Sequence, residues 1–216
     1  RTGELEKDPV LTIGKMTLYR YRPLVDESEL LDTPMLITYA LVNKQYMMDL
    51  QPDRSVIKSF LEKGIDTYII DWGYPAKEDM YLTLEDHIEW YMNDCVDYIL
   101  KTSGKPQITL LGVCQGGTFS TIYTALHPEK IKNFVSMVTP IDFSIDDGLL
   151  FKWSRHFSVD KMVDAYGNVP ADLMNATFVL LKPFELLIDK YVGFGAGMSD
   201  PAYLENFMRT ENWIFD

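Results

Sequence analysis

Residues 107–118 read Gln-Ile-Thr-Leu-Leu-Gly-Val-Cys-Gln-Gly-Gly-Thr. The first part is rich in Ile, Leu and Thr and predicts a buried strand, and a helical pattern follows from Thr118 to Leu126. Between the two lies a G-x-C-x-G sequence, in the setting where a nucleophile elbow presents its reactive side chain. Gly112 and Gly116 are small enough to let strand and helix approach each other. The stretch therefore predicts a strand, a tight turn that carries Cys114, and a helix.

This placement suits a cysteine nucleophile. A thiol at a helix N-terminus faces unpaired N–H groups and the positive end of the helix dipole, and both favour the thiolate. The backbone N–H of Gln115 is one candidate donor for an oxyanion hole. The second donor in this arrangement comes from the loop after an earlier strand, here residues 41–44, and we take the N–H of Val42. We expect these groups to meet at the carboxyl edge of a sheet.

Strands and helices alternate on both sides of this stretch. The other expected strands cover residues 10–13, 16–21, 35–41, 65–70 and 133–138. A helix is expected over 53–63, with Asp53 as its cap, and another from Thr83 to Ile99, where Asp86 completes a capping box. Apolar strands that alternate with helices predict an α/β fold with a mostly parallel sheet.

The pattern changes near residue 140. The remaining residues are rich in helix formers and aromatic side chains, broken by Gly and Pro, and contain no convincing strand. We therefore divide the chain into a core, residues 1–139, and a helical cap or lid over it, residues 140–216. Phe178, Leu181 and Phe184 make this cap apolar, which suits either the exclusion of water from Cys114 or the packing of the cap's own interior.

The partners that a nucleophile elbow needs are an acid and then a histidine, each after a later strand. The three histidines do not fit this order. His87 precedes the elbow on a helix crowded with acidic residues, so we expect it on a solvated face. His127 ends the helix after the elbow, and His156 falls in the cap. We therefore expect the general base to lie outside this chain. Asp142 follows the last strand and either supports the site or caps a turn.

Composition excludes several classes of protein. The 216 residues include 20 Lys and Arg against 32 Asp and Glu, a formal net charge of −12. Such an acidic chain is a poor ligand for nucleic acid and is repelled by an anionic membrane surface. No apolar run is long enough to span a bilayer. The two cysteines provide neither a disulfide framework nor metal-ligand spacing with a histidine, which favours a reducing cytoplasm. Cys95 falls on an apolar helix face and is interpreted as a core residue.

Several short stretches, in this order, resemble the catalytic subunit of polyhydroxyalkanoate synthases. They are residues 39–44, 46–50, 71–73, 111–118, 126–128, 139–143, 167–170 and 182–183. The resemblance extends from about Lys15 to Asp216 and is greatest to the short class III synthases, with class IV next. It implies an α/β-hydrolase core that polymerises (R)-3-hydroxyacyl-coenzyme A, with 3-hydroxybutyryl-coenzyme A as the first expectation.

The resemblance also implies roles for single residues. Cys114 matches the nucleophile that holds the growing polyester as a thioester, and Gln115 and Val42 match the backbone oxyanion positions. The catalytic Asp and His of the family lie beyond residue 216, so the chain, which starts at Arg1 and ends on an apolar stretch, is expected to be a fragment. Further implications are a homodimer with a second synthase subunit, a place at polyester granules, and no cofactor, since coenzyme A belongs to the substrate.

Two alternatives stay open. One is a cysteine hydrolase on the same fold, of the dienelactone hydrolase or thioesterase type. The other is an inactive fragment that serves as a binding module. A hydrolase should complete its triad within a chain of about this length. If the chain is instead a fragment, residues 1–216 alone are expected to be inactive and to expose an apolar sheet edge that depends on a further segment.

Overall fold

The computed structural model describes residues 5–145 and 148–214. The main sheet has 6 strands in the order β1-β2-β6-β3-β7-β8. β1 pairs with β2 and β2 with β6 in antiparallel fashion, and the other neighbours are parallel. In chain order the strands are β1 (Lys7–Ile13), β2 (Met16–Tyr21), β3 (Met35–Thr38), β6 (Thr67–Asp71), β7 (Ile108–Val113) and β8 (Ile131–Met137). The predicted α/β fold with a mostly parallel sheet is confirmed.

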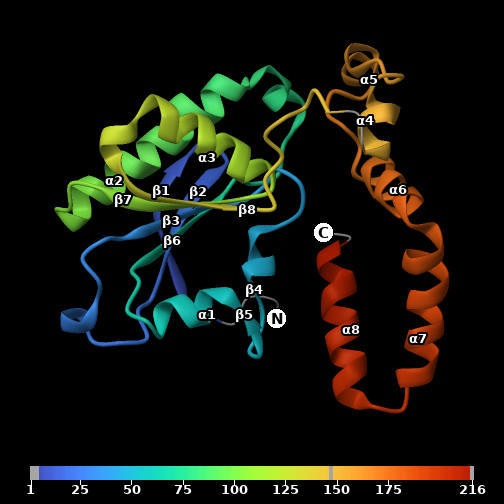
Figure 1. The fold of residues 1–216 in the computed structure, drawn as a ribbon, viewed down its shortest axis with the longest axis horizontal. Coiled ribbons are helices and arrows are strands. Elements are labelled where there is room, and N and C mark those ends of the chain that lie inside the picture. Colours follow the sequence, from blue (N-terminus) through green and yellow to red (C-terminus); the bar gives the residue numbers. More distant parts are fainter. Residues whose placement is uncertain (1–4, 146–147, 215–216) are drawn as a thin grey trace. The chain divides into compact units, whose positions relative to one another are not determined.

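Both faces of this sheet are covered by helices (Figure 1). Successive strand residues point to opposite faces, so Ile37, Ile69 and Leu111 pack in a cluster with helix α1 (Val56–Leu61). Their neighbours Leu36, Ile70 and Leu110 pack on the other side. There they meet the π-helical segment η4 (Asp86–Met92), helix α2 (Asn93–Ser103) and helix α3 (Gln115–Leu126). The central strands are thus buried on both faces, which is why they read as continuous apolar runs.

Local details differ from the sequence predictions. Ser55, and not Asp53, caps α1, because its side chain accepts a hydrogen bond from the N–H of Lys58. A two-stranded hairpin, β4 (Asp49–Gln51) and β5 (Arg54–Ser55), precedes that helix and was not predicted. Single helical turns lie at η1 (Glu27–Glu29), η2 (Gln45–Met48), η3 (Lys77–Tyr81) and η5 (Pro128–Lys130). These short elements depend on tertiary contacts more than on periodic patterns.

Strand β8 forms one edge of the sheet. Six of its seven residues are exposed, including the apolar side chains of Phe134, Val135 and Met137. An edge strand with unpaired backbone groups and apolar side chains is a ready template for another strand. This agrees with the expectation that residues 1–216 present an apolar sheet edge.

The chain divides into two compact units. The first contains the sheet and its helices, and the second joins Pro75–Tyr81 to the described residues between 142 and 214. In the described residues the second unit has helices and no strand. They are α4 (Leu149–Ser154), α5 (Val159–Tyr166), α6 (Ala171–Leu181), the π-helical η6 (Phe184–Asp189), α7 (Lys190–Gly197) and α8 (Pro201–Ile214).

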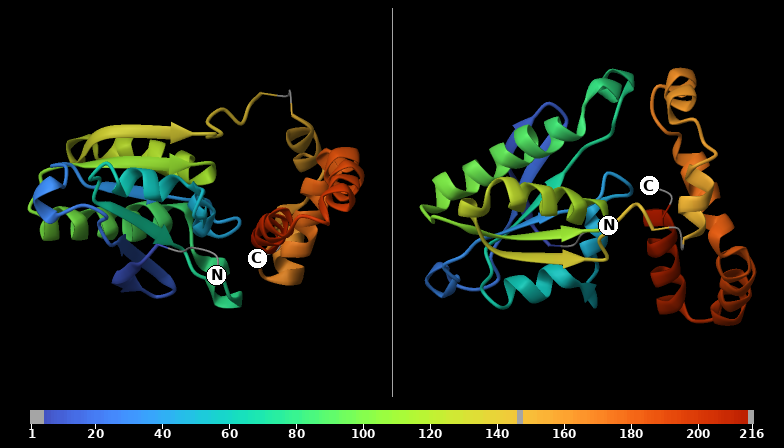
Figure 2. Two further views of the ribbon diagram at one scale, coloured as in Figure 1. Left: turned by 90° about the horizontal axis from the view of Figure 1, so that it is seen from below. Right: turned by 45° about the horizontal axis from the view of Figure 1, so that its top comes forward.

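The second unit has apolar packing of its own. α7 and α8 run side by side as a hairpin (Figure 2), and the rings of Phe194 and Phe207 lie 4.4 Å apart between centroids. An apolar cavity of about 270 Å³ lies among α4, α5 and α6, and Phe157, Leu173 and Phe178 are among the residues that line it. Phe178 lines this cavity and is 42% exposed. The role of this unit as a cap over Cys114 stays a prediction.

Candidate active site

Cys114 occupies the turn between β7 and α3, and its side chain is exposed. Its φ angle is 55°, a left-handed value that costs energy in a residue with a Cβ. The conformation is held from both sides. The N–H of Cys114 donates to the carbonyl of Met137 on β8 at 2.9 Å, and its own carbonyl accepts the N–H of Gly117 at 2.9 Å. A strained residue held in this way presents its thiol at the carboxyl edge of the sheet.

Backbone strain gathers at this edge. Among the described non-glycine residues, those with positive φ are Asn43, Cys114 and Val138. Each follows the carboxyl end of a strand, β3, β7 or β8, and these strands are neighbours in the sheet. Strained backbone clusters at functional sites because the surrounding structure must hold it in place. The distribution therefore marks the carboxyl edge around Cys114 as the candidate active site.

The glycines of the elbow are required by close backbone contacts. A Cβ on Gly112 would lie 2.5 Å from the Cα of Gly117, and one on Gly116 would clash with the carbonyl oxygens of Thr38 and Tyr39. The first turn of α3 thus lies directly against β7 and the end of β3. No larger residue fits at either position without a shift of the backbone.

The structure brings the loop after β3 to the elbow. The N–H of Leu41 donates to the side-chain oxygen of Gln115 at 3.0 Å. Val42, the next residue, packs against the core cluster on the α1 face of the sheet. In the part of the chain that the structure describes, no hydrogen-bond acceptor is found for the N–H of Val42. The N–H of Gln115, in the first turn of α3, likewise has no acceptor within the helix.

Two aromatic residues near the site were not singled out by sequence reasoning. Tyr39 is buried, and its burial, followed by the charge of the Cys114 thiolate, raises the pKa of its hydroxyl. Its phenol therefore stays protonated at neutral pH and lies within electrostatic reach of the sulfur. The indole of Trp72 donates to the Tyr39 carbonyl at 3.0 Å. Both residues lie in stretches on which the family resemblance rests. Nothing else in the sequence indicated that they lie near the site.

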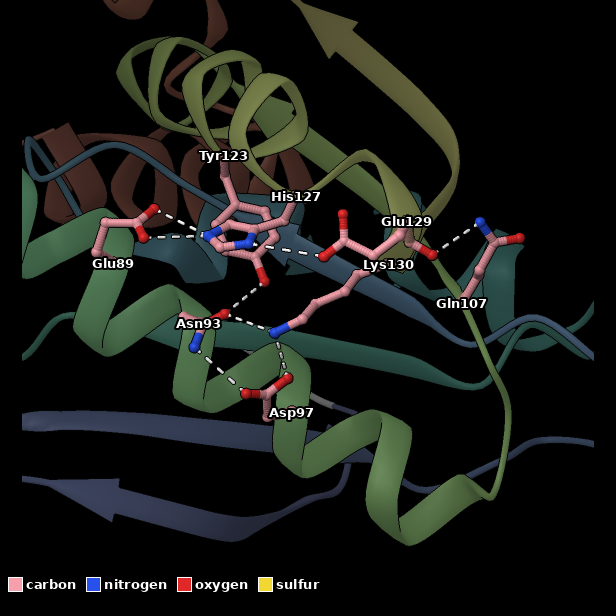
Figure 3. A network of polar contacts seen from close by, with 8 residues as sticks. All are labelled: Glu89, Asn93, Asp97, Gln107, Tyr123, His127, Glu129 and Lys130. Atoms are coloured by element: carbon pink, nitrogen blue, oxygen red, sulfur yellow. Dashed lines mark hydrogen bonds and ion pairs between the residues drawn. The ribbon is translucent and has the colours of Figure 1, made fainter.

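His127 lies at the wrong end of α3 to serve Cys114. The helix has 12 residues, so at 1.5 Å per residue its ends are about 18 Å apart. Figure 3 shows the polar contacts that the His127 ring makes instead. Its Nε2 lies 3.0 Å from Glu89, and nearby Lys130 donates to Asn93 and Asp97. This polar network joins the end of α3 to η4 and α2.

His87 is half-buried, so the expected solvated face describes only part of its surroundings. Its ring packs against Trp72 at 5.3 Å and Phe119 at 6.1 Å between centroids, and its Nδ1 lies 2.8 Å from the Thr83 carbonyl. The acidic neighbours in sequence suggested water, but helical geometry turns this position toward the aromatic side chains after β6 and on α3.

The other two candidates lie in the second unit. His156 is exposed after α4, and its N–H donates to the carbonyl of Trp153. Asp142 accepts the N–H and the hydroxyl of Ser144, at 2.9 and 2.6 Å, and these bonds lower the pKa of its carboxyl group. Asp142 therefore caps a turn, one of the two roles expected for it.

Cys95 and Cys114 differ sharply in environment. Cys95 is 0% exposed, its sulfur lies 3.7 Å from that of Met16, and burial raises the pKa of its thiol. The interpretation of Cys95 as a core residue is confirmed.

This contrast predicts selective alkylation. Iodoacetamide is expected to label Cys114 in the folded protein and to label Cys95 on the order of 10³-fold more slowly, because Cys95 reacts only after the core opens. Peptide mass spectrometry over a time course measures both rates. Denatured protein is the control, in which both thiols should react alike. Comparable rates in the folded state would contradict the burial of Cys95.

The described residues contain no cluster of three or more His, Cys, Asp or Glu side chains suited to a metal ion. None of the helices described here is both long and apolar enough to cross a lipid bilayer.

The sheet order and the strand–turn–helix around Cys114 are those of the alpha/beta hydrolase fold. The sequence profile of the alpha/beta hydrolase fold matches residues 34–207, and the chain belongs to this family. Over its whole length the chain is 48% identical to the poly(3-hydroxyalkanoate) polymerase subunit PhaC of Allochromatium vinosum and 47% identical to that of a Synechocystis species. The resemblance to polyhydroxyalkanoate synthases is thereby confirmed.

The chain spans 61% of the Allochromatium protein and 58% of the Synechocystis protein. Among solved structures, the thioesterase domain from the curacin biosynthetic pathway superposes with a TM-score of 0.52 at 10% identity, covering 84% of this chain and 61% of that one. At such low identity the likeness supports the fold alone.

Proposed function

We propose that this chain is part of the catalytic subunit of a polyhydroxyalkanoate synthase, an acyltransferase that polymerises (R)-3-hydroxyacyl-coenzyme A, with 3-hydroxybutyryl-coenzyme A as its substrate. The observation that carries the proposal is an exposed cysteine at a strained strand-to-helix turn, in a chain 48% identical to a PhaC subunit. The fold alone is shared with hydrolases and would not distinguish the two reactions.

In the proposed reaction the Cys114 thiolate attacks the thioester carbonyl. The N–H groups of Gln115 and Val42 stabilise the negative charge that develops on the carbonyl oxygen. Coenzyme A then leaves as a thiolate and takes up a proton, and the acyl group stays on Cys114. One thioester has replaced another of nearly equal energy, so the acyl group remains activated for attack by a 3-hydroxyl group.

The remaining parts of the machinery are proposed from the family resemblance. A His–Asp pair from outside residues 1–216 takes the proton of Cys114 and later that of the attacking hydroxyl. Coenzyme A belongs to the substrate, and we propose no resident cofactor. We further propose a homodimer that works with a second synthase subunit, in the cytoplasm at the surface of polyester granules.

The product of the reaction tests the proposal. The full-length gene product, given 3-hydroxybutyryl-coenzyme A, is expected to release coenzyme A and to form a high-molecular-weight polyester. Chromatography of both products is the measurement. Release of coenzyme A with free 3-hydroxybutyrate and no polymer would instead identify a cysteine hydrolase.

Residues 1–216 alone are expected to show no activity above the detection limit, because His127 is out of reach of Cys114 and the ring of His87 is packed among aromatic side chains. The same assay, with the full-length gene product as positive control, measures this. Turnover by the shorter chain would show that one of its own histidines is the base.

A further inference from the structure

The loop after β3 is held by side chains from both neighbouring strands. β3 lies between β6 and β7 in the sheet. Trp72, just after β6, donates its indole N–H to the carbonyl of Tyr39 at 3.0 Å. Gln115, just after β7 and Cys114, accepts the N–H of Leu41 with its side-chain oxygen at 3.0 Å. The backbone from Tyr39 to Leu41 is therefore clamped by one donor and one acceptor.

These two bonds determine which N–H of the loop is free. The N–H of Leu41 is used by Gln115, and the N–H of Val42 has no acceptor among the described residues. Asn43 follows with a φ of 63°, within a bend of the chain. Gly116 lets the whole loop lie close, because any Cβ there would meet the Thr38 and Tyr39 carbonyls.

The side chain of Trp72 is itself held by packing, and the segment that carries it is tied to the loop. The Trp72 ring packs edge-on against Phe119 of α3 at 6.1 Å, and against His87 at 5.3 Å. Farther along the loop, Gln45 donates to Asp71 at 2.9 Å, and Asp71 also accepts the N–H of Gly73 at 3.0 Å. The loop is thus tied at both ends to the segment that carries Trp72.

We propose that Trp72 and the side chain of Gln115 are positioning residues that hold the Val42 N–H beside the Gln115 N–H, so that the two form a ready oxyanion hole. The proposal rests on the proposed function of Cys114 as acyl acceptor. Donors that are already in place cost no reorganisation when charge develops on the carbonyl oxygen. The clamp acts through the loop and does not touch the thiol, so it affects acyl transfer and leaves the reactivity of the sulfur unchanged.

The test uses two conservative variants of the full-length gene product. Trp72→Phe removes the indole N–H and keeps a ring, and Gln115→Met removes the acceptor and keeps the length of the side chain. Trp90→Phe and Gln107→Met are matched controls: Trp90 is 46% exposed on η4, and Gln107 precedes β7 at the opposite end of that strand from Cys114. Circular dichroism and thermal unfolding verify that each variant folds.

Acylation of Cys114 is measured by the nitrophenol burst from p-nitrophenyl butyrate, and thiol reactivity by the rate of alkylation with iodoacetamide. Each clamp variant is expected to lower the acylation rate roughly 10- to 100-fold with KM unchanged, because a misplaced donor loses most of its effect. Alkylation, which forms no oxyanion, is expected to stay within about 2-fold of the wild-type rate. Both controls should behave as the wild-type protein does.

Unchanged acylation in both variants would overturn the proposal, and so would a parallel loss of acylation and alkylation, which would mean a general disturbance of the thiol. Failure of the proposed function has a different signature. A wild-type protein that is acylated by the nitrophenyl ester and yet forms no polyester from the coenzyme A thioester contradicts polymerisation and still tests the clamp. A wild-type protein that forms no acyl-enzyme overturns both.

Discussion

Replacing Cys114 by Ala is expected to abolish polyester formation, with a loss on the order of 10⁴-fold or more, because no neighbouring group can replace the sulfur as acyl acceptor. The full-length gene product is assayed by release of coenzyme A from 3-hydroxybutyryl-coenzyme A. Stability should change little, since the side chain is exposed. Cys114→Gly is expected to be equally inactive and more stable by about 1 kcal/mol, because glycine adopts the φ of 55° without strain.

The opposite effects of Cys114→Gly on activity and stability separate the chemical role from a structural one. Cys95→Ala is the matched control: it removes the other sulfur, which is fully buried, and should lower stability while retaining acyl transfer. Retention of polymer synthesis by Cys114→Ala would disprove the assignment of the nucleophile. A less stable Cys114→Gly protein would show that the turn carries no strain.

Gly116→Ala is expected to destabilise the first compact unit by about 3 kcal/mol and to remove activity, because the new methyl group meets backbone atoms rather than movable side chains. The clash is with the carbonyl oxygens of Thr38 and Tyr39, at the end of a strand with neighbours on both sides. The loop that carries Val42 would have to move away from Gln115. Thermal unfolding and the nitrophenol burst measure the two effects.

The control for this substitution is Gly195→Ala, also a glycine in a helix. A Cβ at Gly195 has no atom within 4 Å, and the residue has no positive φ. There the substitution is expected to stabilise the protein by about 0.5 to 1 kcal/mol, the usual gain of Ala over Gly in a helix. Equal effects at the two positions would contradict the close approach of α3 to β3.

Elements with a strong local pattern were predicted well. Strands β6 and β7 are buried on both faces, so they appear in the sequence as continuous apolar runs. The helices are buried on one face, so their apolar residues recur every three or four positions. The β4–β5 hairpin has no such mark, since its strands are short. The aromatic contacts of His87 were missed for a related reason. Its acidic neighbours in sequence indicate an exposed side of the helix, and they carry no information about the contacts of the half-buried ring with Trp72 and Phe119.

By itself the sequence determined the elbow and the family. The spacing of Gly112, Cys114 and Gly116 between an apolar strand and a helix is a local signal, because the turn is made by consecutive residues. Only the tertiary structure decided which groups surround the sulfur. The bond from Leu41 to Gln115 joins residues 74 positions apart, and that from Trp72 to Tyr39 joins residues 33 apart. Such contacts form because β6 and β7 lie on either side of β3 in the sheet. The order of strands in a sheet cannot be read from the periodicity of a single sequence.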